Sequence, residues 1–174
     1  MQTQKNHKNI SNTETIISFI NSFQKPNYKK KLMDLSCKHS ANEKIFFHSY
    51  TSYNKVPEIT SRSHIGIAIY QKNDVMNSTL GSASNKIYEY AACGLPILYF
   101  ESEHYKKYLD KYEWAFATDL SEISLRNCIE SIASNYEYFS KKAKADFENE
   151  FNYEKVFEPV RTFLNFNTVE LWSN

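Results

Sequence analysis

The residues whose types and spacing are best suited to chemistry lie between Ser84 and Phe100. Ser84 is placed to cap a helix, because its hydroxyl can accept a hydrogen bond from a backbone N–H of the first turn. Gly94 can adopt the left-handed conformation that ends a helix, and the run Pro96–Phe100 is typical of a buried strand. A helix start presents unpaired N–H groups and the positive end of a dipole, which together favour an anion. Glu89 follows one turn later, where its carboxylate can accept from sugar hydroxyls beyond a bound phosphate. We therefore expect a nucleotide-sugar site.

Each candidate in this helix also has a structural explanation. Glu89 can be a solvated residue paired with Lys86 three positions earlier, an interaction worth about 0.3 kcal/mol. Lys86 can neutralise a diphosphate, or it can cover apolar surface with its stem. The backbone N–H groups of Lys86 and Ile87 are better phosphate ligands in principle, since a helix start presents them without loss of side-chain entropy. Asn85 and Ser84 would then shape or cap the turn.

The other side chains of the segment, and the nearby histidines, favour packing over ligand contact. We expect Tyr88, Tyr90, Ala91 and Ala92 to pack against a sheet and Cys93 to act as a small buried apolar residue. His48 and His104 follow strands, so either could touch a ligand, although hydrogen-bonded surface histidines are more common there. His64 is interpreted as structural.

The elements that must position this helix alternate between strands and helices. The apolar pattern predicts a first helix from residue 11 or 12 to residue 23, later helices over 29–37, 56–63, 102–111, 121–133, 136–150 and 153–163, and strands over 44–48, 65–70, 96–100 and 114–117. Such an order implies right-handed crossovers, and hence an α/β fold with a Rossmann-like parallel sheet flanked by helices. Residues 1–10 are predicted to be disordered, 11–165 to form one domain, and 166–174 to form a tail that docks on a partner domain or frays.

Three loops follow the carboxyl ends of the predicted strands, which is where open α/β sheets bind ligands. They are Ser49–Asn54, Gln71–Ser84 and Glu101–His104. The second is the longest and leads directly into the helix that carries Glu89. Small polar residues give this loop hydrogen-bonding capacity, and its candidate ligand contacts are Thr79, Gly81 and Ser82.

The thirteen residues from Asn85 to Ile97 resemble a segment of GT-B-type glycosyltransferases, a large group that includes many bacterial envelope and capsule enzymes. The family segment has the form Ser-Lys-hydrophobic-aromatic-Glu-Tyr-x-Ala-x-Gly-x-Pro-hydrophobic. The flanking stretches 56–70 and 149–157 are similar as well, so the resemblance covers roughly residues 42 to 164. It identifies the chain as the carboxy-terminal, nucleotide-sugar-binding domain of such an enzyme, one half of a GT-B fold.

The resemblance implies a glycosyltransferase of polysaccharide biosynthesis, with a nucleotide diphosphate sugar as donor and no cofactor or metal. It gives Glu89 the role of accepting from the 2′- and 3′-hydroxyls of the ribose. Two positions depart from the family: Gly81 stands where many members have a Glu that contacts the donor sugar, which leaves the sugar open, and His64 stands where an Asp is usual.

The acceptor site, and often the catalytic base, belong to an amino-terminal domain in two-domain members, so the catalytic residues here are unknown. Before residue 42 we predict only two helices. The leading hypothesis is therefore a chain that works with a separate amino-terminal subunit and transfers little sugar alone. The alternatives are a truncated remnant, or a non-catalytic nucleotide-binding or protein-interaction domain.

Composition excludes several other classes. Twenty-one basic and 20 acidic side chains give a net charge of +1, too little for electrostatic binding of nucleic acid. The three cysteines are scattered, which favours a reducing compartment over a disulfide scaffold. No apolar run reaches transmembrane length, and residues 1–9 lack the apolar core of a signal peptide. We expect a cytoplasmic protein that can associate peripherally with the inner membrane through a partner.

Overall fold

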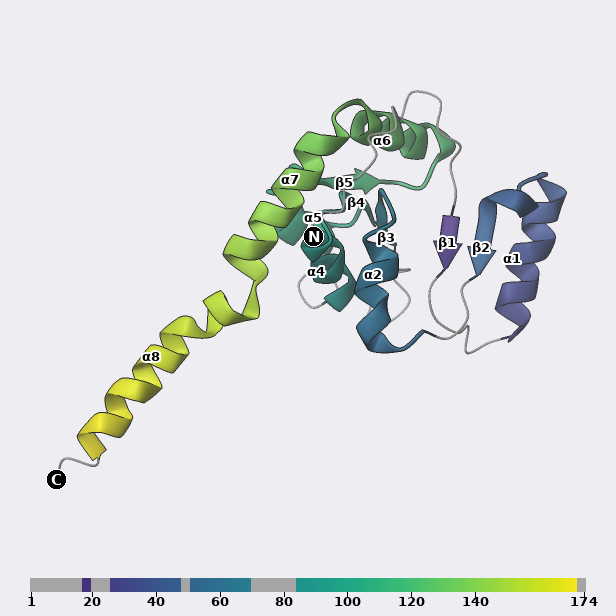
Figure 1. Cartoon of the computed structure of the whole chain (residues 1–174). Coiled ribbons are helices and arrows are strands. Elements are labelled where there is room, and N and C mark those ends of the chain that lie inside the picture. The colour runs from purple at the N-terminus through teal and green to yellow at the C-terminus, as the bar shows by residue number, and fades with distance from the viewer. Residues whose placement is uncertain (1–16, 20–25, 48–50, 70–83, 172–174) are drawn as a thin grey trace. The chain divides into compact units, whose positions relative to one another are not determined.

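The computed structural model describes residues 17–19, 26–47, 51–69 and 84–171. Strands and helices alternate along the chain, and every strand pair in these ranges is parallel (Figure 1). The chain divides into two compact units, Met1–Ile59 and Thr60–Asn174. The α/β class with a parallel sheet flanked by helices is therefore confirmed, while the single domain over 11–165 stays a prediction.

The described residues of the first unit include two parallel strands. Strand β1 (Ile17–Phe19) pairs with β2 (Ile45–Phe47), with Ile17 opposite Ile45. Between them runs α1 (Pro26–Lys38), and two short 3₁₀ turns (Asn42–Lys44 and Tyr53–Lys55) precede and follow β2. Helix α2 (Val56–Thr60) leads into the second unit.

The helix predicted from residue 11 or 12 to 23 is wrong at its centre, because Ile17–Phe19 is a strand. A short apolar run satisfies helical and strand periodicity equally well, and only its pairing partner decides between them. Here that partner is β2, and β-branched isoleucines suit a pleated strand. The prediction of only two helices before residue 42 fails for the same reason.

The second unit holds a three-stranded parallel sheet in the order β3-β4-β5. Its strands are β3 (Gly66–Ala68), β4 (Ile97–Phe100) and β5 (Ala115–Thr118). Helix α4 (Asn85–Ala92) lies between β3 and β4 in the sequence, and α5 (Glu103–Leu109) lies between β4 and β5. After β5 come α6 (Glu122–Ser134), α7 (Tyr136–Asp146), a π-helical turn (Phe147–Phe151) and α8 (Tyr153–Leu171).

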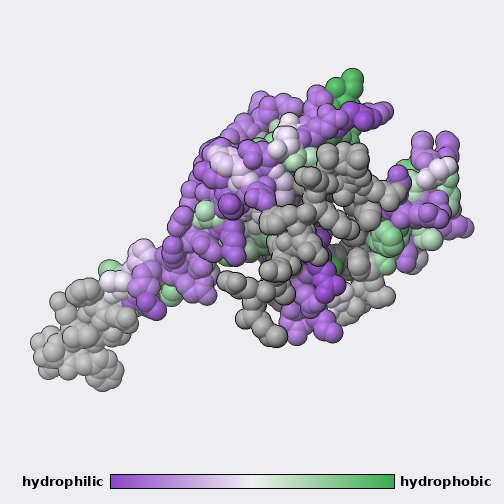
Figure 2. All heavy atoms as spheres, turned by 45° about the horizontal axis from the view of Figure 1, so that its top comes forward, coloured by the Kyte–Doolittle hydropathy of each residue, from purple (hydrophilic) through white to green (hydrophobic). Residues whose placement is uncertain are grey.

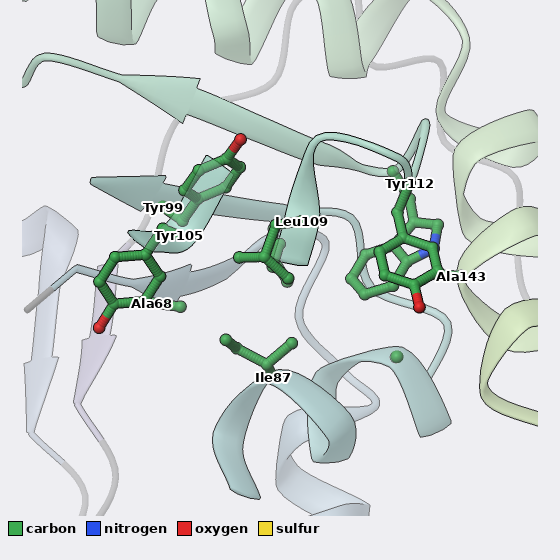
Figure 3. Close-up of a cluster of buried hydrophobic side chains, with 10 residues drawn as sticks. Ala68, Ile87, Tyr99, Tyr105, Leu109, Tyr112 and Ala143 are labelled. Carbon is green, nitrogen blue, oxygen red and sulfur yellow. The ribbon is translucent and has the colours of Figure 1, made fainter. Parts of the chain in front are cut away.

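The core of this unit lies between β4 and the helices that flank it. Figure 3 shows Ile87 of α4 pointing toward Leu109 of α5, and both side chains belong with Tyr99 of β4 to one buried cluster. The first three residues of β4 are buried, so both faces of this central strand are covered, as predicted for the run Pro96–Phe100. Helix α6 contacts the neighbouring strand β5, where Cys128 Sγ lies 3.4 Å from the carbonyl oxygen of Ala117.

The turn between α5 and β5 is tied to the end of α7 by polar contacts. The indole of Trp114, which is completely buried, donates to Asp146 at 2.9 Å. Tyr112 donates its hydroxyl to Glu150 at 2.7 Å, and the ammonium of Lys111 lies 2.9 Å from the same carboxylate oxygen. These contacts hold the π turn against the sheet.

Helix α8 runs past its predicted end at residue 163 into the predicted tail and stops at Leu171. Between 153 and 164 its side chains are exposed, including Tyr153, Val156, Phe163 and Leu164. Figure 2 shows hydrophilic and hydrophobic residues interspersed along this helix. No helix in the described ranges combines the length and the apolar character needed to cross a membrane.

Candidate functional site

The start of α4 is built from backbone contacts. Ser84 occupies the N-cap position with extended backbone, and its carbonyl accepts from the N–H of Ile87 at 3.1 Å. Its hydroxyl does not cap the helix, contrary to the prediction, because this three-residue turn closes through the main chain and Ser84 itself is buried. The N–H of Ile87, a predicted phosphate donor, is therefore already engaged by Ser84.

The end of α4 confirms the role predicted for Gly94. Its φ is +69°, a conformation that favours glycine. The N–H of Gly94 donates to Ala91 at 2.8 Å, and the N–H of Leu95 donates to Tyr90 at 2.9 Å. This pair of hydrogen bonds is a Schellman motif, and the burial of Leu95 anchors it. The chain is thereby redirected at once into β4.

Three faces of α4 have distinct surroundings. Ile87 and Ala91, four residues apart, are fully buried in the core. Tyr90 packs so closely on Gly66 that a Cβ added at this glycine would lie 2.4 Å from the tyrosine ring. The ring of Tyr88 lies 4.9 Å from that of Phe151 in the π turn.

The remaining face of α4 carries the candidate ligand-binding side chains. Asn85 and Lys86 are exposed and Glu89 is half-buried. Asn85 and Glu89 are one turn apart, and Lys86 precedes Glu89 by three residues, so the three share one side of the helix. The structure therefore brings these three predicted residues together at the first turns of α4, while it sends the side chain of Ile87 into the core.

The carboxyl edge of the sheet is polar where the structure describes it. Because β3, β4 and β5 are parallel, the helices that follow them begin at the same edge. Ser102 caps α5 by accepting from the N–H of Tyr105 at 3.3 Å, and Glu101 pairs with Lys106. This edge therefore presents helix starts, which favour anions.

The loop after β5 is a part of this edge that the sequence analysis missed. Asp119 accepts from the N–H of Ser121 at 2.8 Å. Hydrogen bonds with the side chain and then the backbone of Ser121 lower the pKa of the Asp119 carboxyl. Leu120 has a φ of +69°, and Thr118, fully buried, accepts from its N–H at 3.0 Å. The sequence did offer one signal for this loop: it follows a strand of the parallel sheet, and ligands bind beyond the carboxyl ends of such strands.

The two described histidines of interest differ. Nε2 of His104 is buried, and it finds no hydrogen-bond partner within the part of the chain that the structure describes. Its ring lies 5.1 Å from that of Tyr108. His64 contacts the ring of Tyr136 edge-on at 5.4 Å, as its structural interpretation predicts. Cys93 is only partly buried, less than expected.

Several predicted positions cannot be placed against α4. Thr79, Gly81, Ser82 and His48 lie outside the described residues. Of the loop Ser49–Asn54, the described part belongs to the first unit, where the hydroxyl of Ser52 donates to Asn54 at 2.7 Å. Among the described residues, no cluster of three His, Cys, Asp or Glu side chains is arranged to hold a metal ion.

Comparison with known proteins gives one informative likeness. No family model matches the sequence, and no curated protein matches it at a significant level. The fold matches the crystal structure of WaaG, a glycosyltransferase involved in lipopolysaccharide biosynthesis, with a TM-score of 0.54 and 15% sequence identity. The match covers 72% of this chain and 32% of WaaG. The chain thus has the fold of one Rossmann-like domain of a GT-B glycosyltransferase.

Proposed function

We propose that this chain is the donor-binding half of a glycosyltransferase and binds the nucleoside diphosphate part of a nucleotide sugar at the start of α4. The observation that carries the proposal is the shared face of Asn85, Lys86 and Glu89 beside a helix start, at the carboxyl edge of a parallel sheet. Such an edge binds nucleotides in open α/β folds. The likeness to the fold of a glycosyltransferase supports a nucleotide sugar as the ligand.

Each group has a separate task in this proposal. The helix start and the Lys86 ammonium stabilise negative charge on the diphosphate. The carboxylate of Glu89, one turn deeper, accepts hydrogen bonds from the ribose hydroxyls. As the glycosidic bond breaks, the leaving diphosphate gains charge, and the same positive groups lower the energy of that state. The proposal assigns no role to a metal or a cofactor in this half of the reaction.

Nucleotide binding is tested by calorimetric titration of the purified chain with UDP, GDP, ADP and CDP. We expect saturable binding of one of them, weakened in Glu89→Ala by about 1.5–3 kcal/mol, since a charge-assisted hydrogen bond is lost. Glu130→Ala is the matched control, because Glu130 is an exposed residue of α6. Equal binding by Glu89→Ala and the wild type would contradict the assignment of Glu89.

Sugar transfer is a separate question. The chain spans 32% of the length of WaaG, so we propose that the acceptor site and the catalytic base come from another domain or subunit. Because WaaG is involved in lipopolysaccharide biosynthesis, we also propose that this assembly works at the cytoplasmic side of a membrane. We expect the isolated chain to bind the donor and transfer almost no sugar. Full transfer by the chain alone would overturn this part. Nucleotide binding that stays unproductive with every candidate partner would favour a non-catalytic nucleotide-binding domain, an alternative supported by Gly81 standing at a donor-contacting position.

A further inference from the structure

We infer that Phe151, in the π-helical turn after α7, is a positioning residue that sets the rotation of α4 and thereby the direction of Glu89. The inference rests on the proposed function for its consequence in nucleotide binding. Its structural part, the control of α4 by the π turn, stands on contacts of the described residues alone.

The rotation of α4 is defined by what touches its sides. Successive residues of an α-helix are turned by about 100°. Ile87 and Ala91 therefore face the core, opposite Glu89, while Tyr88 and Tyr90 project on the two flanks between these faces. On one flank, the ring of Tyr90 packs directly against Gly66 of β3. On the other flank, the ring of Tyr88 meets that of Phe151, with centroids 4.9 Å apart. A rotation of α4 in either sense would drive one tyrosine into its neighbour.

The flank formed by Phe151 is itself held firmly. Its ring centroid lies 5.2 Å from that of Tyr112 and 6.4 Å from that of Trp114, two buried aromatic residues just before β5. The residue before it, Glu150, accepts from the hydroxyl of Tyr112 at 2.7 Å. The turn is closed by the N–H of Asn152, which donates to the carbonyl of Phe147 at 2.8 Å. Phe151 is thus a fixed support rather than a mobile cover.

The π-helical conformation gives this support its place. One extra residue per turn shifts the side chains that follow it around the helix axis, and such turns are frequent at functional sites. Asn152 then leaves helical geometry, with ψ of 119°, and its side-chain oxygen accepts from the N–H of Glu154 at 2.9 Å to begin α8. The same short segment therefore ends α7, starts α8 and contacts α4.

The first test needs no ligand. Hydrogen exchange of the backbone amides of α4 is compared between Phe151→Ala and Phe139→Ala in the full chain. Phe139 is the matched control, because it belongs to α7, the helix that leads to the π turn. Its ring packs edge-on against that of Phe116 in β5, with the two centroids 5.0 Å apart. We expect exchange across residues 85–92 to increase by about fivefold or more in Phe151→Ala only. Unchanged exchange in α4, or an equal change in Phe139→Ala, would overturn the inference.

The second test measures nucleotide affinity. We expect Phe151→Ala to weaken it by about fivefold, a typical size for coupling through packed side chains. This loss of affinity should disappear in the Glu89→Ala background, because Phe151 acts through the Glu89 side chain. Phe151→Tyr keeps the aromatic ring and should therefore bind the nucleotide as tightly as the wild type. Additive losses in this double-mutant cycle would overturn the link to Glu89. Should Phe151→Ala not fold, Phe151→Leu replaces it in both tests.

The two tests separate the inference from the proposed function. Suppose that hydrogen exchange in α4 increases only in Phe151→Ala, and that the wild-type chain binds none of the four nucleotides. These results would refute the proposed function and leave the positioning role of Phe151 in place. Nucleotide binding that is insensitive to Phe151 would refute the positioning role and leave the proposed function.

Discussion

At the scale of single residues, close approach explains positions that composition alone leaves ambiguous. Gly66 is the first residue of β3, and the ring of Tyr90 occupies the space where a side chain would stand. Ala91 and Ile87 complete the contact between α4 and the sheet. Because Gly66 has no Cβ, α4 can lie closer to β3 than it could if this residue carried a side chain.

Gly66→Ala is expected to destabilise the protein by about 1–3 kcal/mol, the usual cost of overpacking a filled core. The added Cβ would lie 2.4 Å from the Tyr90 ring, so either the ring or the strand must move. Urea denaturation followed by circular dichroism measures the loss. The companion variant is Tyr90→Leu: in that background the same glycine substitution should cost clearly less, and equal costs would show that Tyr90 is not the obstacle.

At the scale of elements, the contacts between the α5–β5 turn and the α7 end combine aromatic packing with charge. Glu150 accepts from Lys111 and Tyr112, and these two contacts lower the pKa of its carboxyl below the ordinary 4.5. Glu113, in the same turn, has its pKa lowered by the hydroxyl of Tyr138 and the ammonium of Lys142. Burial and the hydrogen bond to Glu150 raise the pKa of Tyr112 to about 12, although the nearby Lys111 opposes that rise.

The lowered carboxyl pKa values predict the acid side of the stability profile. A carboxyl whose folded pKa lies below its unfolded value stabilises the fold above the unfolded value, and that contribution disappears as pH falls through the folded pKa. The free energy of unfolding should therefore decrease below about pH 4.5. Glu113→Gln combined with Glu150→Gln should flatten this decrease, in urea denaturation series from pH 3 to pH 7. A profile as steep as that of the wild type would mean that other carboxyls dominate it.

At the scale of the whole molecule, the chain places its apolar side chains very unevenly. The core of the second unit buries the bulky residues Trp114, Tyr99 and Ile97 almost completely. Helix α8, in contrast, leaves Val156 59% and Phe163 66% exposed. Since stability comes from burial of apolar area, α8 between 153 and 164 contributes little of it through these side chains.

Phe163→Gln is expected to change the free energy of unfolding by no more than about 0.5 kcal/mol, as is usual for exposed positions. Trp114→Ala, at a site with no exposed surface, is expected to cost about 3–5 kcal/mol. Both changes are measured by urea denaturation at a single low protein concentration. A loss above about 2 kcal/mol for Phe163→Gln would contradict the exposure of this residue.

Local signals in the sequence were sufficient to determine α4 and the strand after it. Gly94 can adopt a positive φ without a steric penalty, and Pro96 cannot continue a helix, so the end of α4 follows from the residue types themselves. The same holds for the order of strands and helices after residue 44, and that order was enough to predict a parallel Rossmann-like sheet.

Tertiary structure decided what depends on partners distant in the sequence. The run around Ile17 became a strand because β2 is available to pair with it, and no local pattern reveals that partner. Phe151 meets Tyr88, 63 positions earlier in the sequence, because a π-helical turn brings it there. Each outcome depends on a contact between segments far apart in the chain, whose free energy exists only once the fold has brought them together.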